Sequence, residues 1–121
     1  MELKKLCEID YPSQEFLCPP QILRENNNVK LEFDYESESG EYKKAEIIFL
    51  NTIGYKCCSL ECTPAEAIAA YDKICVVKNS DWLQVVKNNY RGLKDFDYNH
   101  YCIFFEDYGC YEFIANNYKY K

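Results

Sequence analysis

The sequence is poor in the residues and patterns that usually mark an enzyme. Its 121 residues include one histidine, His100, one tryptophan and only four glycines. It contains no G-x-G-x-x-G, no P-loop and no G-x-S-x-G pattern, which disfavours a doubly wound nucleotide-binding fold. We therefore predict no catalytic residue and no cofactor, and we expect a protein that is not an enzyme.

Long apolar runs are also missing. No stretch approaches the roughly 18–20 apolar residues of a membrane span. The N-terminus, Met-Glu-Leu-Lys-Lys-Leu-Cys-Glu, has neither the apolar region nor the small-residue cleavage site of a secretory signal. We therefore expect a cytoplasmic protein with reduced thiols and no membrane partner.

Positive charge is scarce where negative charge is dense. Residues 1–42 hold ten acids and four bases, so that 4 − 10 = −6, which is the net charge of the whole chain. An acidic field of this kind repels nucleic acid and attracts basic proteins. The lysines and arginines never cluster, and we therefore predict no nucleic-acid partner.

Cysteine, in contrast, is abundant, with eight residues in the chain. A zinc site usually shows paired ligands at a spacing such as C-x2-C. The nearest approach is Cys57-Cys58-x3-Cys62, and adjacent residues on a strand point to opposite faces. We expect the cysteines to be small apolar side chains of the core and predict no metal site.

Hydrophobic alternation predicts two hairpins. Val29, Leu31, Phe33 and Tyr35 alternate with polar residues, and after a polar turn a second strand runs to about Leu50. Residues 55–59 suggest a third strand. Near the C-terminus, 100–105 and 110–115 are predicted to form the second hairpin around a loop that contains a glycine. Both of its faces are mostly apolar, which indicates a central position.

Two helices are predicted between the hairpins. Thr63, Pro64 and Glu66 form a capping pattern, which predicts a helix to about residue 73. Residues 74–77 are expected to be extended. Ser80 begins the second helix, whose apolar face carries Trp82, Val85, Val86 and Tyr90, and Gly92 is expected to end it.

These elements predict a single α+β domain over residues 1–121. The expected architecture is an antiparallel β-sheet built from hairpins, with two helices packed on one face. Pro12 and the Pro19-Pro20 pair interrupt regular structure, so residues 1–20 are expected to be an irregular N-terminal segment that wraps the domain.

Two chemical alternatives centre on His100. On a strand, His100 and Cys102 share a face with Cβ atoms roughly 6–7 Å apart, which is too far for direct activation of the thiol. Glu106, Asp107 and Glu112 flank the last turn and could act as paired acids. The alternative function is thus a small thiol- or carboxylate-dependent enzyme with a pocket near His100. Otherwise His100 is expected to be a strand-end residue that touches solvent.

Protein recognition is the function that the composition favours. Tyrosines and acids interleave in 34–42 and 106–112, and such residues suit interfaces with basic partners. The predicted partner-binding residues are Asp34, Glu36, Glu38, Glu41, Glu106, Asp107, Tyr108 and Glu112. The oligomeric state stays open, and a self-associating structural protein with an exposed edge strand is a third possibility.

A resemblance points the same way. The run from His100 to Ala115, together with Ala70-Tyr-Asp-Lys-Ile and Ser80-Asp-Trp-Leu, resembles a group of small bacterial proteins. Some proteins of that kind look like immunity proteins of polymorphic toxin systems. The resemblance covers about the last half of the chain and implies a binder that neutralises a basic cognate toxin. It assigns no binding residue.

Overall fold

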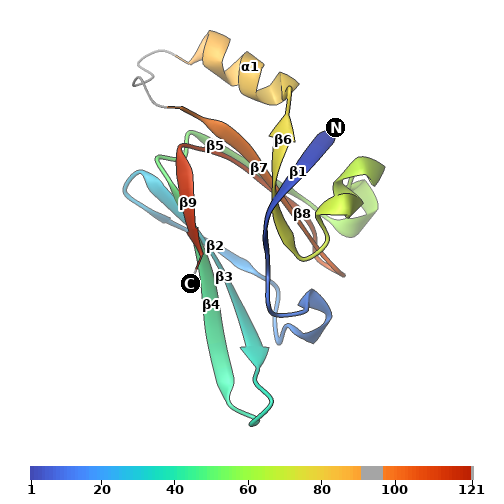
Figure 1. Ribbon diagram of the computed structural model, residues 1–121. Helices are drawn as coiled ribbons and strands as arrows, with labels where there is room; N and C mark the ends of the chain where they lie inside the picture. The colour runs from blue at the N-terminus through green and yellow to red at the C-terminus, as the bar shows by residue number, and fades with distance from the viewer. Residues whose placement is uncertain (91–96, 121) are drawn as a thin grey trace.

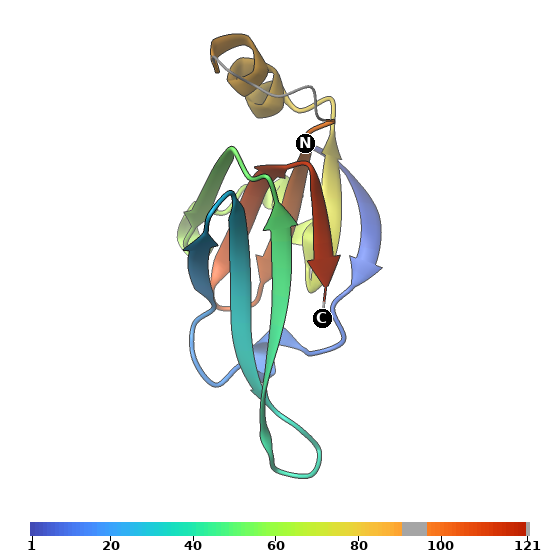
Figure 2. The same cartoon turned by 90° about the vertical axis from the view of Figure 1, so that its left-hand side faces the viewer.

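The computed structural model describes residues 1–90 and 97–120, and most of them lie in two antiparallel sheets (Figures 1 and 2). The first sheet has five strands in the order β1-β6-β7-β8-β5, and the second has four in the order β2-β3-β4-β9. The strands are β1 (Glu2–Glu8), β2 (Gln21–Glu25), β3 (Asn28–Glu36), β4 (Tyr42–Leu50), β5 (Gly54–Cys58), β6 (Lys73–Lys78), β7 (Asn99–Phe105), β8 (Gly109–Ala115) and β9 (Asn117–Tyr120).

The main core fills the space between the two sheets. Alternate residues of β3 and β4 face alternate residues of β7 and β8, as expected for stacked sheets. Phe49 of β4 and Phe113 of β8 are both fully buried, and their rings stack with centroids 4.0 Å apart. This contact joins the two sheets across the core.

Both predicted hairpins are confirmed. Strands β3 and β4 pair from Val29 with Phe49 to Glu36 with Tyr42, and β7 pairs with β8 from Asn99 with Ala115 to Phe105 with Gly109. The predicted central position of the second hairpin is also confirmed, because every residue of β8 is buried. The predicted extended segment 74–77 lies within β6.

The predicted α+β architecture with two helices packed on one face is wrong. Two sheets share the core, and the described residues contain one α-helix, α1 (Asp81–Asn89). It lies beyond one end of the sheets rather than on a face, and none of its side chains is buried (Figure 2). An apolar stripe on a nine-residue helix was too weak a signal to show what the helix packs on.

The other predicted helix is a short 3-10 segment, η3 (Ala65–Ala70). It packs on the outer face of the five-stranded sheet, where Ala67 and Ala70 are fully buried. Their spacing of three residues matches the 3-10 repeat. Pro64 precedes the segment, and the Thr63 hydroxyl donates to the carbonyl of Ser59 instead of capping a helix.

The second predicted helix begins as expected. The Ser80 Oγ accepts a hydrogen bond from the backbone N–H of Leu83, which is the geometry of an N-cap. The helix ends at Asn89, and Gly92, which was predicted to end it, lies outside the described residues. Two residues of its predicted apolar face, Val85 and Tyr90, are at least half exposed.

The N-terminal segment 1–20 was predicted to be irregular, and for its first part this is wrong. Residues Glu2–Glu8 form β1, an edge strand that pairs with β6. Its side chains are mostly exposed and charged, so no apolar alternation marked it. The rest of the segment is a turn with a short 3-10 piece, η1 (Ser13–Glu15), that crosses one end of the sandwich.

In the described ranges no helix is long and apolar enough to cross a membrane.

Candidate functional site

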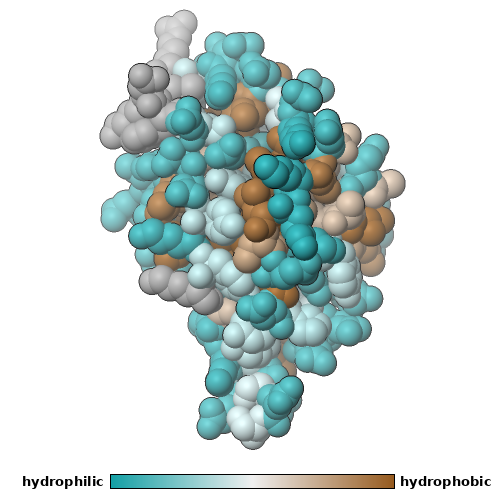
Figure 3. Space-filling model, in the orientation of Figure 1, coloured by the Kyte–Doolittle hydropathy of each residue, from teal (hydrophilic) through white to brown (hydrophobic). Residues whose placement is uncertain are grey.

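A cavity of about 520 Å³ lies at the end of the molecule where the β3–β4 hairpin projects. That end is covered by hydrophilic and neutral side chains (Figure 3). The cavity lies between the hairpin and the turn that follows β1. Its lining residues are Asp10, Tyr11, Pro12, Glu15, Tyr35, Glu36, Ser37, Glu38, Ser39 and Lys43, which amounts to four acids against one base.

Two tyrosines form the aromatic part of this cavity. The rings of Tyr11 and Tyr35 stack with centroids 3.7 Å apart. A hydrogen bond with Tyr11, together with burial, raises the pKa of Tyr35 to about 12. Tyr35 therefore stays neutral at physiological pH, and the negative charge of the cavity comes from the carboxylates. We call the ten lining residues the acidic cavity.

Local structure explains why the acids meet there. The backbone N–H of Ser37 donates to the carbonyl of Glu41 at 2.8 Å and closes the hairpin. Gly40 takes a positive φ of 83° that the turn requires. Phe16, just after η1, packs on Phe33 with ring centroids 4.8 Å apart. The N-terminal turn is thereby held against the strand that leads into the hairpin.

The structure divides the predicted hairpin acids. Glu36 and Glu38 line the acidic cavity, and Glu41 is exposed on the same hairpin. Asp34 lies apart from them, half-buried on the outward face of the four-stranded sheet, where its Oδ2 accepts from the Cys18 thiol at 3.5 Å. Asp10 and Glu15 also line the cavity, and the sequence argument missed them because they lie far from the hairpin in the chain.

The β7–β8 turn lies at the same end of the molecule. Tyr108 packs near Phe16, with ring centroids 6.0 Å apart, and the Glu106 N–H donates to the Ser13 Oγ at 2.8 Å. The Tyr71 hydroxyl donates to the Glu106 carboxylate at 2.6 Å, and this hydrogen bond, followed by burial, raises the pKa of Tyr71 to about 12. Asp107 is exposed. The residues Glu106, Asp107 and Tyr108 therefore lie at the same end of the sandwich as the acids of the β3–β4 hairpin.

Glu112, the last predicted partner-binding residue, is not on the surface. It is 3% exposed and lies on the outer face of the five-stranded sheet, where the ammonium of Lys56 lies close to it. Its Oε1 accepts from His100 Nε2 at 2.8 Å. The carboxylate of Glu112 thus contacts His100 and the ammonium of Lys56.

The prediction that His100 touches solvent is wrong. His100 is 3% exposed, and its Nδ1 lies 2.6 Å from the Ser80 Oγ. Ser80, His100 and Glu112 therefore form one hydrogen-bonded chain that joins the start of α1 to β7 and β8. The sequence offered no signal for it, because the three residues come from separate elements.

Lys56 and Trp82 complete this region. The Lys56 ammonium lies 3.9 Å from the Glu112 Oε2 and 4.3 Å from the centre of the Trp82 ring. Burial raises the pKa of Glu112, but the hydrogen bond from His100 and the charge of Lys56 outweigh it, and the pKa falls below its usual value. A second cavity of about 400 Å³ borders this chain and is lined by Ser80, His100, Glu112, Lys56 and Trp82 among others.

The eight cysteines are free thiols. Cys75, Cys102 and Cys110 are buried on the outer face of the five-stranded sheet, so the prediction that cysteines fill the core is confirmed for these three. The hydrogen bond with Cys110, followed by burial, raises the pKa of Cys102 above its usual value.

Comparison of the chain with protein-family models, with curated proteins and with solved structures found no match.

Proposed function

We propose that this chain is a non-enzymatic protein-binding module that takes basic side chains of a protein partner into the acidic cavity. The observation that carries the proposal is the lining of that cavity, which includes four carboxylates and a stacked pair of tyrosines. Carboxylates bind guanidinium and ammonium groups, and tyrosine rings attract the same cations through their faces.

The distribution of charge supports this proposal. The excess acid of the chain lies in residues 1–42, and this segment supplies the cavity's acids. Concentrated negative charge speeds encounters with a basic partner and orients it. The β7–β8 turn, which contacts the η1 segment through Ser13 and Phe16, carries Glu106, Asp107 and Tyr108 at the same end of the molecule. A partner of modest size could contact both turns at once.

The specific form of the proposal is an immunity protein that neutralises a basic toxin domain in the cytoplasm. It rests on the resemblance of residues 70–115 to small bacterial proteins of that kind. A reducing cytoplasm also suits the eight free cysteines, two of which, Cys57 and Cys62, are exposed.

Charge reversal at matched positions tests the proposal. Glu36→Lys with Glu38→Lys reverses two acids of the cavity, whereas Glu61→Lys with Glu66→Lys makes the same change in net charge on exposed residues of η2 (Leu60–Cys62) and η3. Proteins captured from the native lysate are identified by mass spectrometry, and the strongest basic candidate is purified for titration calorimetry against each variant.

We expect the cavity variant to lose at least about tenfold in affinity, which corresponds to about 1.4 kcal/mol, while the control keeps most of it. Binding to the unmodified protein should weaken as salt rises. An equal loss of affinity in both variants would show that only the net charge of the protein matters. Unchanged affinity in the cavity variant would show that the cavity is not part of the interface.

The second cavity favours one other candidate, a carboxylate-dependent enzyme. Ser80, His100 and Glu112 are linked by hydrogen bonds beside it, and no cysteine is among its described lining residues. His100 could then exchange a proton with a substrate group or with Ser80. Hydrolysis of p-nitrophenyl esters tests this function. The rate should fall by roughly 10²–10⁴-fold in His100→Gln, and a rate equal to that of the unmodified protein would exclude the site.

A further inference from the structure

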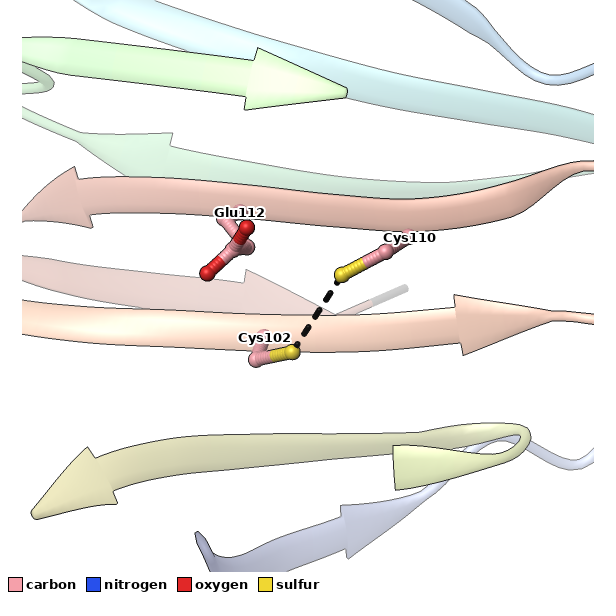
Figure 4. A group of neighbouring side chains, drawn as sticks. All are labelled: Cys102, Cys110 and Glu112. Atoms are coloured by element: carbon pink, nitrogen blue, oxygen red, sulfur yellow. Dashed lines mark hydrogen bonds between the residues drawn. The ribbon is translucent and has the colours of Figure 1, made fainter. Parts of the chain in front are cut away.

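Three metal-binding side chains meet on the outer face of the five-stranded sheet. The Sγ atoms of Cys102 and Cys110 and a carboxylate oxygen of Glu112 all lie within 4.8 Å of one another. Figure 4 shows Cys102 on β7 beside Cys110 and Glu112 on β8, with the two sulfur atoms turned toward each other. Cys102 and Cys110 are fully buried, and Glu112 is 3% exposed. We call these three residues the Cys–Cys–Glu cluster.

Strand pairing brings the cluster together. Cys110 and Glu112 are two residues apart on β8 and therefore share a face. Cys102 pairs directly with Glu112 across the β7–β8 ladder, which places it on that same face. Two ligands at i and i+2 on one strand, with a third on the neighbouring strand, form a rigid triangular donor set.

The distances suit a tetrahedral ion. Two sulfur atoms bound to one zinc at about 2.3 Å each lie about 3.8 Å apart in tetrahedral geometry. The Sγ atoms of Cys102 and Cys110 are 3.6 Å apart. A zinc-bound carboxylate oxygen lies about 3.6 Å from each sulfur, which small side-chain rotations of Glu112 would achieve.

The surroundings hold the carboxylate in place. His100 Nε2 donates to the Glu112 Oε1 at 2.8 Å, and the Lys56 ammonium lies 3.9 Å from Oε2. Ligating carboxylates are typically held by such hydrogen bonds, which fix their direction. Two thiolates, one carboxylate and a divalent ion sum to −1, and the nearby Lys56 offsets that charge.

We propose that Cys102, Cys110 and Glu112 bind a zinc ion. Thiolate with carboxylate in a tetrahedral arrangement favours zinc over calcium or magnesium, which take oxygen ligands. On binding, each thiol releases its proton to solvent and forms a Zn–S bond, while zinc gives up water ligands. Because the cluster is buried, the ion enters as the β7–β8 hairpin forms or opens. This proposal does not depend on the acidic cavity.

The test begins by removing the exposed thiols. Cys57→Ser with Cys62→Ser eliminates two surface cysteines and provides the background for all variants. This protein is unfolded, refolded with Co²⁺ or Zn²⁺, and dialysed. We expect about one tightly held ion per chain, a thiolate-to-cobalt charge-transfer absorption, and X-ray absorption of the zinc form showing at least two sulfur neighbours at about 2.3 Å.

Matched variants assign the ligands. Cys102→Ser, Cys110→Ser and Glu112→Gln should each weaken zinc binding by at least about tenfold. Cys75→Ser is the control, because Cys75 is equally buried, pairs with Cys102 on β6, and lies outside the cluster. It should bind zinc like the background. Circular dichroism of the metal-free variants establishes that each folds.

Two results would overturn the proposal. One is the absence of stoichiometric metal and of the cobalt–thiolate absorption in the background protein. This result does not depend on any substitution in the core. The other is equal loss in Cys75→Ser and Cys102→Ser, which would reject the assigned ligands. In either case the 3.6 Å contact between the two sulfurs is a thiol–thiol hydrogen bond of the core.

Discussion

Single residues decide how tightly β5 approaches β8. Gly109 has a φ of 99°, and a Cβ at this position would lie 2.0 Å from the carbonyl oxygen of Cys58. Gly40 has a similar φ of 83°, but the nearest atom to its Cβ position is 3.9 Å away. The two glycines therefore separate the effect of backbone conformation from the effect of close contact.

This difference predicts the stability of two alanine variants. Gly40→Ala should lower the free energy of unfolding by about 1 kcal/mol, the cost of a left-handed conformation. Gly109→Ala should lower it by about 4 kcal/mol, because β5 must also move away. Urea unfolding of both variants measures the values. Equal losses would show that the contact with Cys58 relaxes freely.

Tyr71 predicts a dependence of stability on alkaline pH. Its hydrogen bond to Glu106 favours the neutral phenol and raises the pKa of Tyr71 from 10.0 to about 12. The folded protein thus holds this proton more tightly than the unfolded chain. The contribution is complete below about pH 10 and is lost as the pH rises toward 12.

The Tyr71→Phe variant tests this dependence. Its free energy of unfolding should be lower than that of the unmodified protein by about 1–2 kcal/mol near pH 8, and the gap should narrow near pH 11. Tyr42→Phe is the control, because Tyr42 is 78% exposed. Urea titrations at both pH values measure the gap. A gap that stays constant with pH would contradict the assigned role of the Tyr71 proton.

At the scale of elements, η3 stabilises the five-stranded sheet through small side chains. Ala67 is fully buried against the sheet, whereas the neighbouring Ile68 is 52% exposed. Close contact at Ala67 leaves no room for a larger side chain.

Two substitutions distinguish the face of η3 that packs on the sheet from the face that is exposed. Ala67→Leu should lower the free energy of unfolding by about 1–3 kcal/mol through overpacking, and Ile68→Ala should change it by less than about 1 kcal/mol. Thermal or urea unfolding of each variant measures the change. A larger loss in Ile68→Ala than in Ala67→Leu would mean that η3 turns its other face to the sheet.

At the scale of the whole molecule, the two sheets are expected to unfold together. The described core is continuous between them, and the stacked rings of Phe49 and Phe113 connect β4 with β8 within it. Phe49→Ala should lower the free energy of unfolding by about 3–5 kcal/mol. Amide hydrogen exchange should show an equal loss of protection in β3 and in β8. Loss confined to the four-stranded sheet would show that the sheets are independent units.

Local pattern determined the parts of this fold that do not depend on distant residues. The strand β3 and the hairpin of β7 and β8 follow from alternation with a period of two, and Ser80 begins α1 because its own side chain caps the next turn. The acidity of residues 1–42 is likewise a property of the sequence alone. These signals lie within a few residues of the structure that they predict.

Tertiary structure alone decided where the strands pair and which polar groups meet. The edge strands β1 and β9 have no buried residues, so only pairing with β6 and β4 identifies them as strands. Glu112 has the polarity of a surface residue, yet β8 is covered on both faces, and the carboxylate is buried beside His100. The Cys–Cys–Glu cluster depends on the register between β7 and β8, because a shift of one residue would turn Cys102 to the opposite face.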